Sequence, residues 1–81
     1  MIRFSQHMEQ QLADRPELRQ EWIEATIADP DWSAPDPDPA LTRSYKVIAA
    51  FGRRVLRVVH RPSGTDVLVV TAHFDRGARR R

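Results

Sequence analysis

At 81 residues the chain is long enough for one small domain, which buries only roughly 60–65% of the surface that its unfolded chain exposes, so a single modest core is expected. The chain has no cysteine, which excludes a disulfide framework and a thiolate metal site and favours a reducing, cytoplasmic setting. Because no apolar run approaches the length of a bilayer span and the first residues are polar, the sequence predicts neither a transmembrane helix nor a signal peptide, and no membrane partner.

Charge is divided unequally between the two halves of the chain. Residues 1–40 carry nine of the eleven acidic side chains, whereas residues 41–81 carry ten of the thirteen basic ones. Twelve of these thirteen cations are arginine, which binds phosphate through two parallel hydrogen bonds better than lysine does. The basic half therefore favours a phosphate-rich partner such as RNA, and an arginine-rich surface that is merely solvated is the alternative.

The chain is predicted to form one domain over residues 1–81. Its sequence patterns indicate, in order, a helical part (1–29), a proline-rich connector (30–41), an antiparallel sheet (42–76) and a basic tail (77–81). In the helical part, Ser5 is placed to begin a first helix. Asp14 and Glu17 resemble a capping box that opens a second helix, which ends where Asp29 precedes Pro30. The buried face of the second helix is expected to hold Leu18, Trp22, Ile23, Thr26 and Ile27.

The connector holds four of the six prolines, which predicts an extended, polyproline-like segment. Trp32 in its middle is expected to anchor the connector to the core by burying a large ring. The functional alternative is an exposed tryptophan that stacks on a nucleobase.

Three segments of the basic half, 42–51, 54–61 and 67–76, alternate with the period of β-strands and are joined by a two-residue turn at Gly52 and Arg53 and a loop at 62–66. This register places Ile48 opposite Arg57 and Thr71 beside Arg57. The apolar face is expected to receive the helices and to carry Tyr45, Val47, Ala49, Phe51, Leu56, Val58, Leu68, Val70, Ala72 and Phe74. The opposite face is expected to carry Lys46, Arg57, Arg61, Thr71 and His73. The predicted fold class is α+β, with two N-terminal helices packed on a three-stranded antiparallel β-meander.

Arg57 is the most informative residue, because it lies inside an apolar strand next to a hydroxyl and near a histidine. A guanidinium there can hold a phosphate and stabilise charge that develops on it, and Thr71 can donate a further hydrogen bond. His7 or His73 can move the proton, since an imidazole titrates near neutral pH. This set predicts metal-free RNA cleavage by attack of the 2′-hydroxyl on its own phosphate. The residues expected to hold the nucleic-acid backbone are Lys46, Arg54, Arg61 and Arg76.

Each candidate has a structural alternative. Arg57 can pair with an acidic residue of the connector or of a helix, Thr71 is a favoured strand residue, and His7 can be a hydrogen-bonded histidine at the edge of the core. His60 falls in the register of Tyr45 and is interpreted as structural. The three histidines are far apart in sequence and no cysteine assists them, so no metal site and no cofactor is expected.

Five segments of the chain together resemble the bacterial family called domain of unknown function 4258. They are SQH at 5–7, IADPDW at 27–32, RSYKVI at 43–48, RVLRVVH at 54–60 and VVTAHFDR at 69–76. The likeness spans nearly the whole chain, and its most specific parts are LRVV and VVTAHFDRGARR. In its order of helices followed by an antiparallel meander, that family resembles RelE/ParE-type toxins and the barnase-, EndoU- and colicin-like ribonucleases. The resemblance implies an RNA cleft at which His7, Arg57 and Thr71 meet.

The leading hypothesis is a toxin-like, metal-independent endoribonuclease. The alternative is a non-catalytic interaction module whose cationic face binds an acidic, antitoxin-like protein, or binds nucleic acid without cutting it. A third hypothesis, a purely structural role in a larger assembly, stays open.

Overall fold

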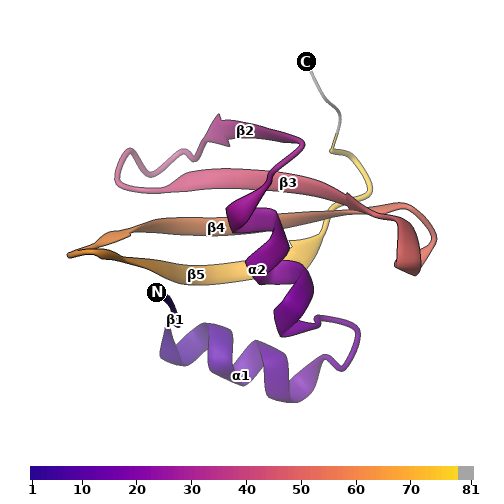
Figure 1. The fold of residues 1–81 in the computed structure, drawn as a ribbon, viewed down its shortest axis with the longest axis horizontal. Coiled ribbons are helices and arrows are strands. Elements are labelled where there is room, and N and C mark those ends of the chain that lie inside the picture. The colour runs from indigo at the N-terminus through magenta and orange to yellow at the C-terminus, as the bar shows by residue number, and fades with distance from the viewer. Residues whose placement is uncertain (79–81) are drawn as a thin grey trace.

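The computed structural model describes residues 1–78. Its helices are α1 (Gln6–Asp14) and α2 (Gln20–Ala28), and its strands are β1 (Ile2–Phe4), β2 (Trp32–Pro35), β3 (Thr42–Ile48), β4 (Arg54–Ser63) and β5 (Asp66–Phe74). The strands form one mixed sheet in the order β1-β5-β4-β3-β2, in which β1 runs parallel to β5 and the other pairs are antiparallel (Figure 1). No helix in residues 1–78 is long and apolar enough to cross a membrane.

The fold is α+β with two helices, but the predicted three-stranded antiparallel meander is wrong, because β1 and β2 add one strand to each edge of the sheet. The strand β1 has only three residues, too few to show alternation in the sequence. The strand β2 lies in the proline-rich connector, where Pro35 ends a four-residue strand at the sheet edge. Proline is tolerated at an edge because no neighbouring strand needs its missing N–H.

The helix boundaries confirm part of the sequence analysis. Ser5 caps α1, since its hydroxyl accepts a hydrogen bond from the Met8 backbone N–H at 3.0 Å. The predicted capping box is wrong, because Asp14 is the last residue of α1 and α2 begins after Arg19 without a side-chain cap. The expected buried face of α2 is confirmed at Ile23 and Thr26, which are fully buried.

The register between β3 and β4 differs by three residues from the expected one, because Ile48 lies opposite Arg54 and not opposite Arg57. A 3₁₀ turn at Ala49–Phe51 lengthens the connection, and Gly52 follows in the left-handed region. A shift by an odd number turns every β3 side chain to the other face. Tyr45 therefore lies on the face of Arg57, whereas Lys46 lies on the face that α2 covers.

A β-bulge between Val59 and His60 changes the register of β4 and β5 along their length. Before the bulge Arg57 lies opposite His73, and after it His60 lies opposite Val69. The bulge explains why Val69, and not the predicted Leu68, enters the core.

The core lies between the helices and one face of the sheet, with α2 crossing that face and α1 lying along β5 (Figure 1). Its buried members are Met8, Leu18, Ile23, Ile48, Leu56, Val58, Val69 and Ala72. The face of the sheet turned away from α2 is called the far face below. Tyr45 and Val59 are buried there although they lie outside the core cluster.

Past the end of the short strand β1, side chains of Ser5 and of α1 form hydrogen bonds with the backbone at the edge of β5. The Gln11 amide donates to the Ala72 carbonyl at 3.1 Å, and its oxygen accepts the Ala72 N–H at 3.3 Å and the Thr71 hydroxyl at 2.7 Å. Ser5 donates to the Val70 carbonyl at 2.9 Å. These bonds satisfy the backbone of an edge that would otherwise be free to pair with another strand.

Candidate functional site

A row of four directly paired residues crosses the far face, one from each of four neighbouring strands. Trp32 of β2 pairs with Tyr45 of β3, Tyr45 with Arg57 of β4, and Arg57 with His73 of β5. The Trp32 and Tyr45 rings are stacked, with centroids 5.0 Å apart and planes 8° from parallel. This cross-strand row joins an aromatic pair to a guanidinium and an imidazole on one surface.

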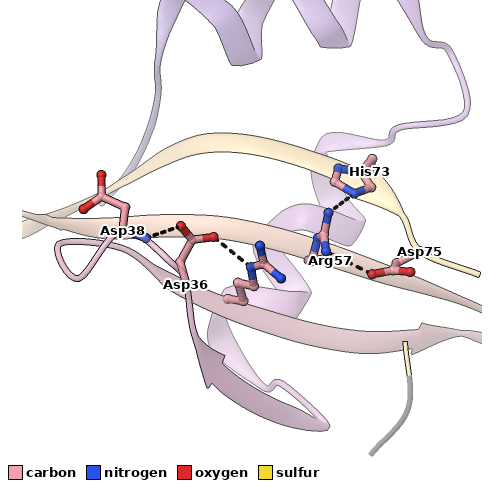
Figure 2. A network of polar contacts seen from close by, with 6 residues as sticks. Asp36, Asp38, Arg57, His73 and Asp75 are labelled. Atoms are coloured by element: carbon pink, nitrogen blue, oxygen red, sulfur yellow. Dashed lines mark hydrogen bonds and ion pairs between the residues drawn. The ribbon is translucent and has the colours of Figure 1, made fainter. Parts of the chain in front are cut away.

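The Arg57 guanidinium is held on both sides. Its Nη1 donates to Asp75 Oδ2 at 3.0 Å, and its Nη2 contacts His73 Nε2 (Figure 2). Only 19% of the Arg57 side chain and 24% of the Asp75 side chain are exposed, and the Arg57 Nε is buried without a partner in residues 1–78. Arg57 thus forms an ion pair, but its partner Asp75 follows β5, and the expected partner in the connector or in a helix is wrong.

A second arginine, Arg43, lies in the adjacent row of the far face, where it pairs with Ala34 of β2. Its Nε donates to Asp36 Oδ1 at 2.7 Å, and Asp36 Oδ2 accepts the Asp38 N–H at 2.9 Å (Figure 2). The hydrogen bond from Arg43 lowers the pKa of Asp36, and the N–H of Asp38 acts in the same direction. The hydrogen bond to Asp36 raises the pKa of Arg43, and a hydrogen bond with the Tyr45 side chain acts in the same direction, so this guanidinium is held in place and charged.

A groove of about 700 Å³ follows these residues over β2, β3 and β4. Its lining includes the aromatic pair, Arg43, Arg57 and Asp75, with Ala34 as a small residue among them. This volume lies within the range of roughly 300–1,000 Å³ that is usual for ligand sites. Two guanidiniums, one carboxylate and two rings fit a ligand that has both a flat ring and an anionic group.

His73 continues the cross-strand row beside the groove. Burial lowers its pKa below the usual value, and the nearby Arg57 lowers it further, against the opposing effect of Asp75. Arginine has only donors, so the Nε2 that contacts Arg57 must accept and the ring must be neutral with its proton on Nδ1. A neutral imidazole beside a guanidinium can accept a proton once this contact is exchanged.

The predicted catalytic set comes together only in part. Arg57 and His73 are in contact, and Thr71 lies one row away, opposite Val59, with its hydroxyl bonded to Gln11. His7 is an exposed residue of the first turn of α1. Among residues 1–78 no hydrogen bond joins His7 to the other three.

The predicted backbone-binding residues lie in three different places. Lys46 lies on the α2 side, where its Nζ donates to the Asp29 carbonyl at the end of α2 at 2.9 Å. Arg61 lies near the C-terminal end of β4, and its Nη1 donates to the Pro62 carbonyl at 3.2 Å. Arg54 and Arg76 are exposed at the opposite end of the sheet. Of the predicted basic tail (77–81), residues 79–81 lie outside the described residues.

The sequence did not predict Asp75, Asp36 or Arg43 as parts of the site. Asp75 is two residues after His73, so the period of a strand alone places both on one face. The acidic first half and basic second half signalled that pairs such as Arg43 with Asp36 would form, without showing which. Trp32 was singled out, but its partner Tyr45 was assigned to the wrong face with the register.

Within residues 1–78 no group of three or more metal-ligating side chains is gathered. No family model, curated protein or solved structure matches this chain.

Proposed function

We propose that the groove of the far face binds single-stranded RNA. The observation that carries this proposal is the cross-strand row, which joins two stacked rings to a guanidinium inside a groove of nucleotide size. Unpaired bases stack on aromatic side chains, whereas arginine holds the phosphates between them. A duplex hides its base faces, so the proposal is specific for single strands.

Trp32 supplies the stacking surface in this proposal. Its ring lines the groove and is stacked on Tyr45, which is buried and holds the indole in place. Stacking of a base on an aromatic side chain contributes about 1–3 kcal/mol. A tryptophan fixed by a neighbouring ring loses little conformational freedom when it binds, which favours the upper part of this range.

Arg43 supplies the phosphate contact. Asp36 accepts a hydrogen bond from its Nε at 2.7 Å, and the guanidinium lines the groove. This arrangement orients a guanidinium at the wall of the groove, where it can bind a phosphate. Arg57 is less available, because a phosphate must first displace Asp75 from its Nη1.

The test is fluorescence anisotropy with a labelled single-stranded RNA of about eight nucleotides and with the matching duplex. Trp32→Ala should weaken single-strand binding about 5- to 150-fold, the equivalent of one stacked base. Arg43→Gln should weaken it and reduce the salt slope by about 0.7, the value of one phosphate contact. Trp22→Phe is the matched control, since Trp22 packs on the core side against Phe51. Equal binding by all four proteins would contradict the proposal.

A second candidate function, metal-independent cleavage of the bound strand, is supported by the contact between Arg57 and His73. His73 Nε2 would take the proton of the 2′-hydroxyl as its oxygen attacks the phosphorus, and Arg57 would stabilise the added charge. The products would be a 2′,3′-cyclic phosphate and a 5′-hydroxyl that takes its proton from water. His7 has no part in this arrangement.

Cleavage is tested with purified protein and RNA in EDTA. Folded His73→Ala and Arg57→Gln variants should lose about 100-fold or more of the activity, whereas His7→Ala should keep it. If wild-type protein binds RNA without cutting it, the binding function stands and the catalytic one is wrong. If all variants cut alike, the activity is that of a contaminant.

A further inference from the structure

Three arginines gather at the end of the sheet where β4 begins and β5 ends. Arg53 precedes β4, Arg54 is its first residue, and Arg76 is the second residue after β5. All three are exposed, and none of them makes an ion pair or a side-chain hydrogen bond within residues 1–78. This group is called the arginine corner below.

The corner encloses a hollow of about 220 Å³ lined by Arg53, Arg54, Val55, Phe74, Asp75 and Arg76. That volume is below the roughly 300 Å³ of the smallest usual ligand pockets, so the hollow suits a compact group better than a nucleobase. Three positive charges meet there with one carboxylate, Asp75. Its Oδ2 accepts from Arg57 at 3.0 Å and its Oδ1 accepts from the Gly77 N–H at 2.9 Å.

Two features distinguish the Arg54 side chain and the Arg53 backbone. The Arg54 guanidinium lies over two aromatic rings, 5.0 Å from the Phe51 centroid and 5.2 Å from the Phe74 centroid. Aromatic rings attract a cation placed over their faces, so these contacts hold the Arg54 guanidinium beside the hollow. Arg53 follows Gly52 in a turn where both residues are left-handed, with φ of 58° and 61°. A non-glycine residue held at positive φ often marks a functional site.

We propose that the arginine corner is a binding site for a phosphate group, distinct from the groove. The uncompensated charge, the compact hollow and the oriented Arg54 all fit a small, multiply charged oxyanion. The corner and the groove share Asp75 in their linings, so one RNA strand can occupy both. This extension to RNA rests on the proposed function, whereas binding of phosphate alone does not.

The first experiment is an NMR titration of the full chain with inorganic phosphate at constant ionic strength, following the amides of Arg53, Arg54 and Arg76. Wild-type protein should show saturable shifts at these residues, and the double variant Arg54→Gln/Arg76→Gln should bind at least tenfold more weakly. Arg3→Gln is the control, because it removes an exposed charge at Leu68, roughly 20 Å away along β5. It should change the affinity less than twofold.

Because Arg54 also packs on aromatic rings, Arg76→Gln alone is measured as a variant that leaves these contacts intact; it should bind at least threefold more weakly. Equal binding by wild type and the Arg54/Arg76 variants, or an equal loss in Arg3→Gln, would overturn the proposal. The phosphate titration uses no RNA, so the corner is tested even if the groove binds none.

The source of the phosphate is distinguished with short RNA carrying a 5′-phosphate, a 3′-phosphate or neither. A terminal phosphate that occupies the corner should tighten binding at least tenfold over the unphosphorylated strand, and the double variant should abolish this gain. A backbone phosphate in the corner should make the three strands bind alike, with an equal loss for each in the double variant. If the double variant changes none of the three affinities, RNA does not use the corner.

Discussion

Replacing Asp75 by asparagine should lower stability and raise RNA affinity at the same time. Asp75 holds Arg57 with both side chains about four-fifths buried, so the pair lies between an exposed ion pair, worth about 0–1 kcal/mol, and a hydrogen bond to a buried charge, worth about 1.5–3 kcal/mol. We expect the free energy of unfolding to fall by about 1–2 kcal/mol. The asparagine oxygen keeps the hydrogen bond from the Gly77 N–H, whereas the bond from Arg57 is lost. For a domain of this size this lowers Tm by roughly 5–15 °C.

The same substitution frees Arg57 Nη1 and removes one negative charge from the groove. RNA affinity should rise roughly threefold or more at low salt, and the salt slope should steepen by up to about 0.7. Stability is measured by thermal and urea denaturation, and binding by anisotropy at several salt concentrations. A double-mutant cycle with Arg57→Gln should give a coupling of about 1 kcal/mol. A coupling below about 0.3 kcal/mol, or an RNA affinity that falls in Asp75→Asn, would refute the view that Asp75 competes with phosphate for Arg57.

Three further outcomes are expected. Burial lowers the pKa of both His60 and His73, so the unfolded state takes up protons at a higher pH than the folded state does. The free energy of unfolding should therefore fall as the pH drops below about 6.5. Urea titrations at pH 5.5 and 7.5 measure this fall, and equal stability at the two pH values would contradict the expectation. Gln11→Ala should cost about 1–3 kcal/mol and increase self-association in light scattering, because it exposes the β5 edge; a monomer as stable as wild type would show that the edge needs no cover. Arg53→Gly should raise stability by about 1 kcal/mol by relieving positive φ and weaken phosphate binding, and a drop in stability would contradict the assigned backbone strain.

The sequence predicted features that depend on a few neighbouring residues. The Ser5 cap and the stop at Asp29 follow from local chemistry, and both appear in the structure. The capping box at Asp14 failed because α1 extends to that residue and a turn is needed before α2 can cross the sheet. The edge strands failed because their pairing partners are remote, and no local pattern reveals that Ile2 lies beside Val67.

The sequence predicted only those features of the site that follow from the alternation of side chains along a single strand. Arg57 and His73 were placed on one face, but their direct contact depends on the register and on the bulge at Val59. The turn at Ala49–Phe51 turned Tyr45 to the far face, so the aromatic half of the groove was invisible from sequence. Register errors of this kind affect a whole strand, because one misplaced turn reverses every side chain of it.

The arginines of the groove and those of the arginine corner differ in whether they are paired with a carboxylate, and this difference predicts different kinetic roles. Arg43 and Arg57 in the groove are each paired with a carboxylate, whereas Arg54 and Arg76 in the arginine corner are unpaired in the described chain. Unpaired surface charges act over about a Debye length and accelerate encounter, whereas short-range contacts made after docking govern dissociation. Stopped-flow measurements should therefore show that Arg54→Gln/Arg76→Gln mainly lowers the association rate and its salt dependence, while Trp32→Ala mainly raises the dissociation rate. The reverse pattern would mean that the corner holds the bound strand and the groove attracts it, which the pairing of its arginines with Asp36 and Asp75 argues against.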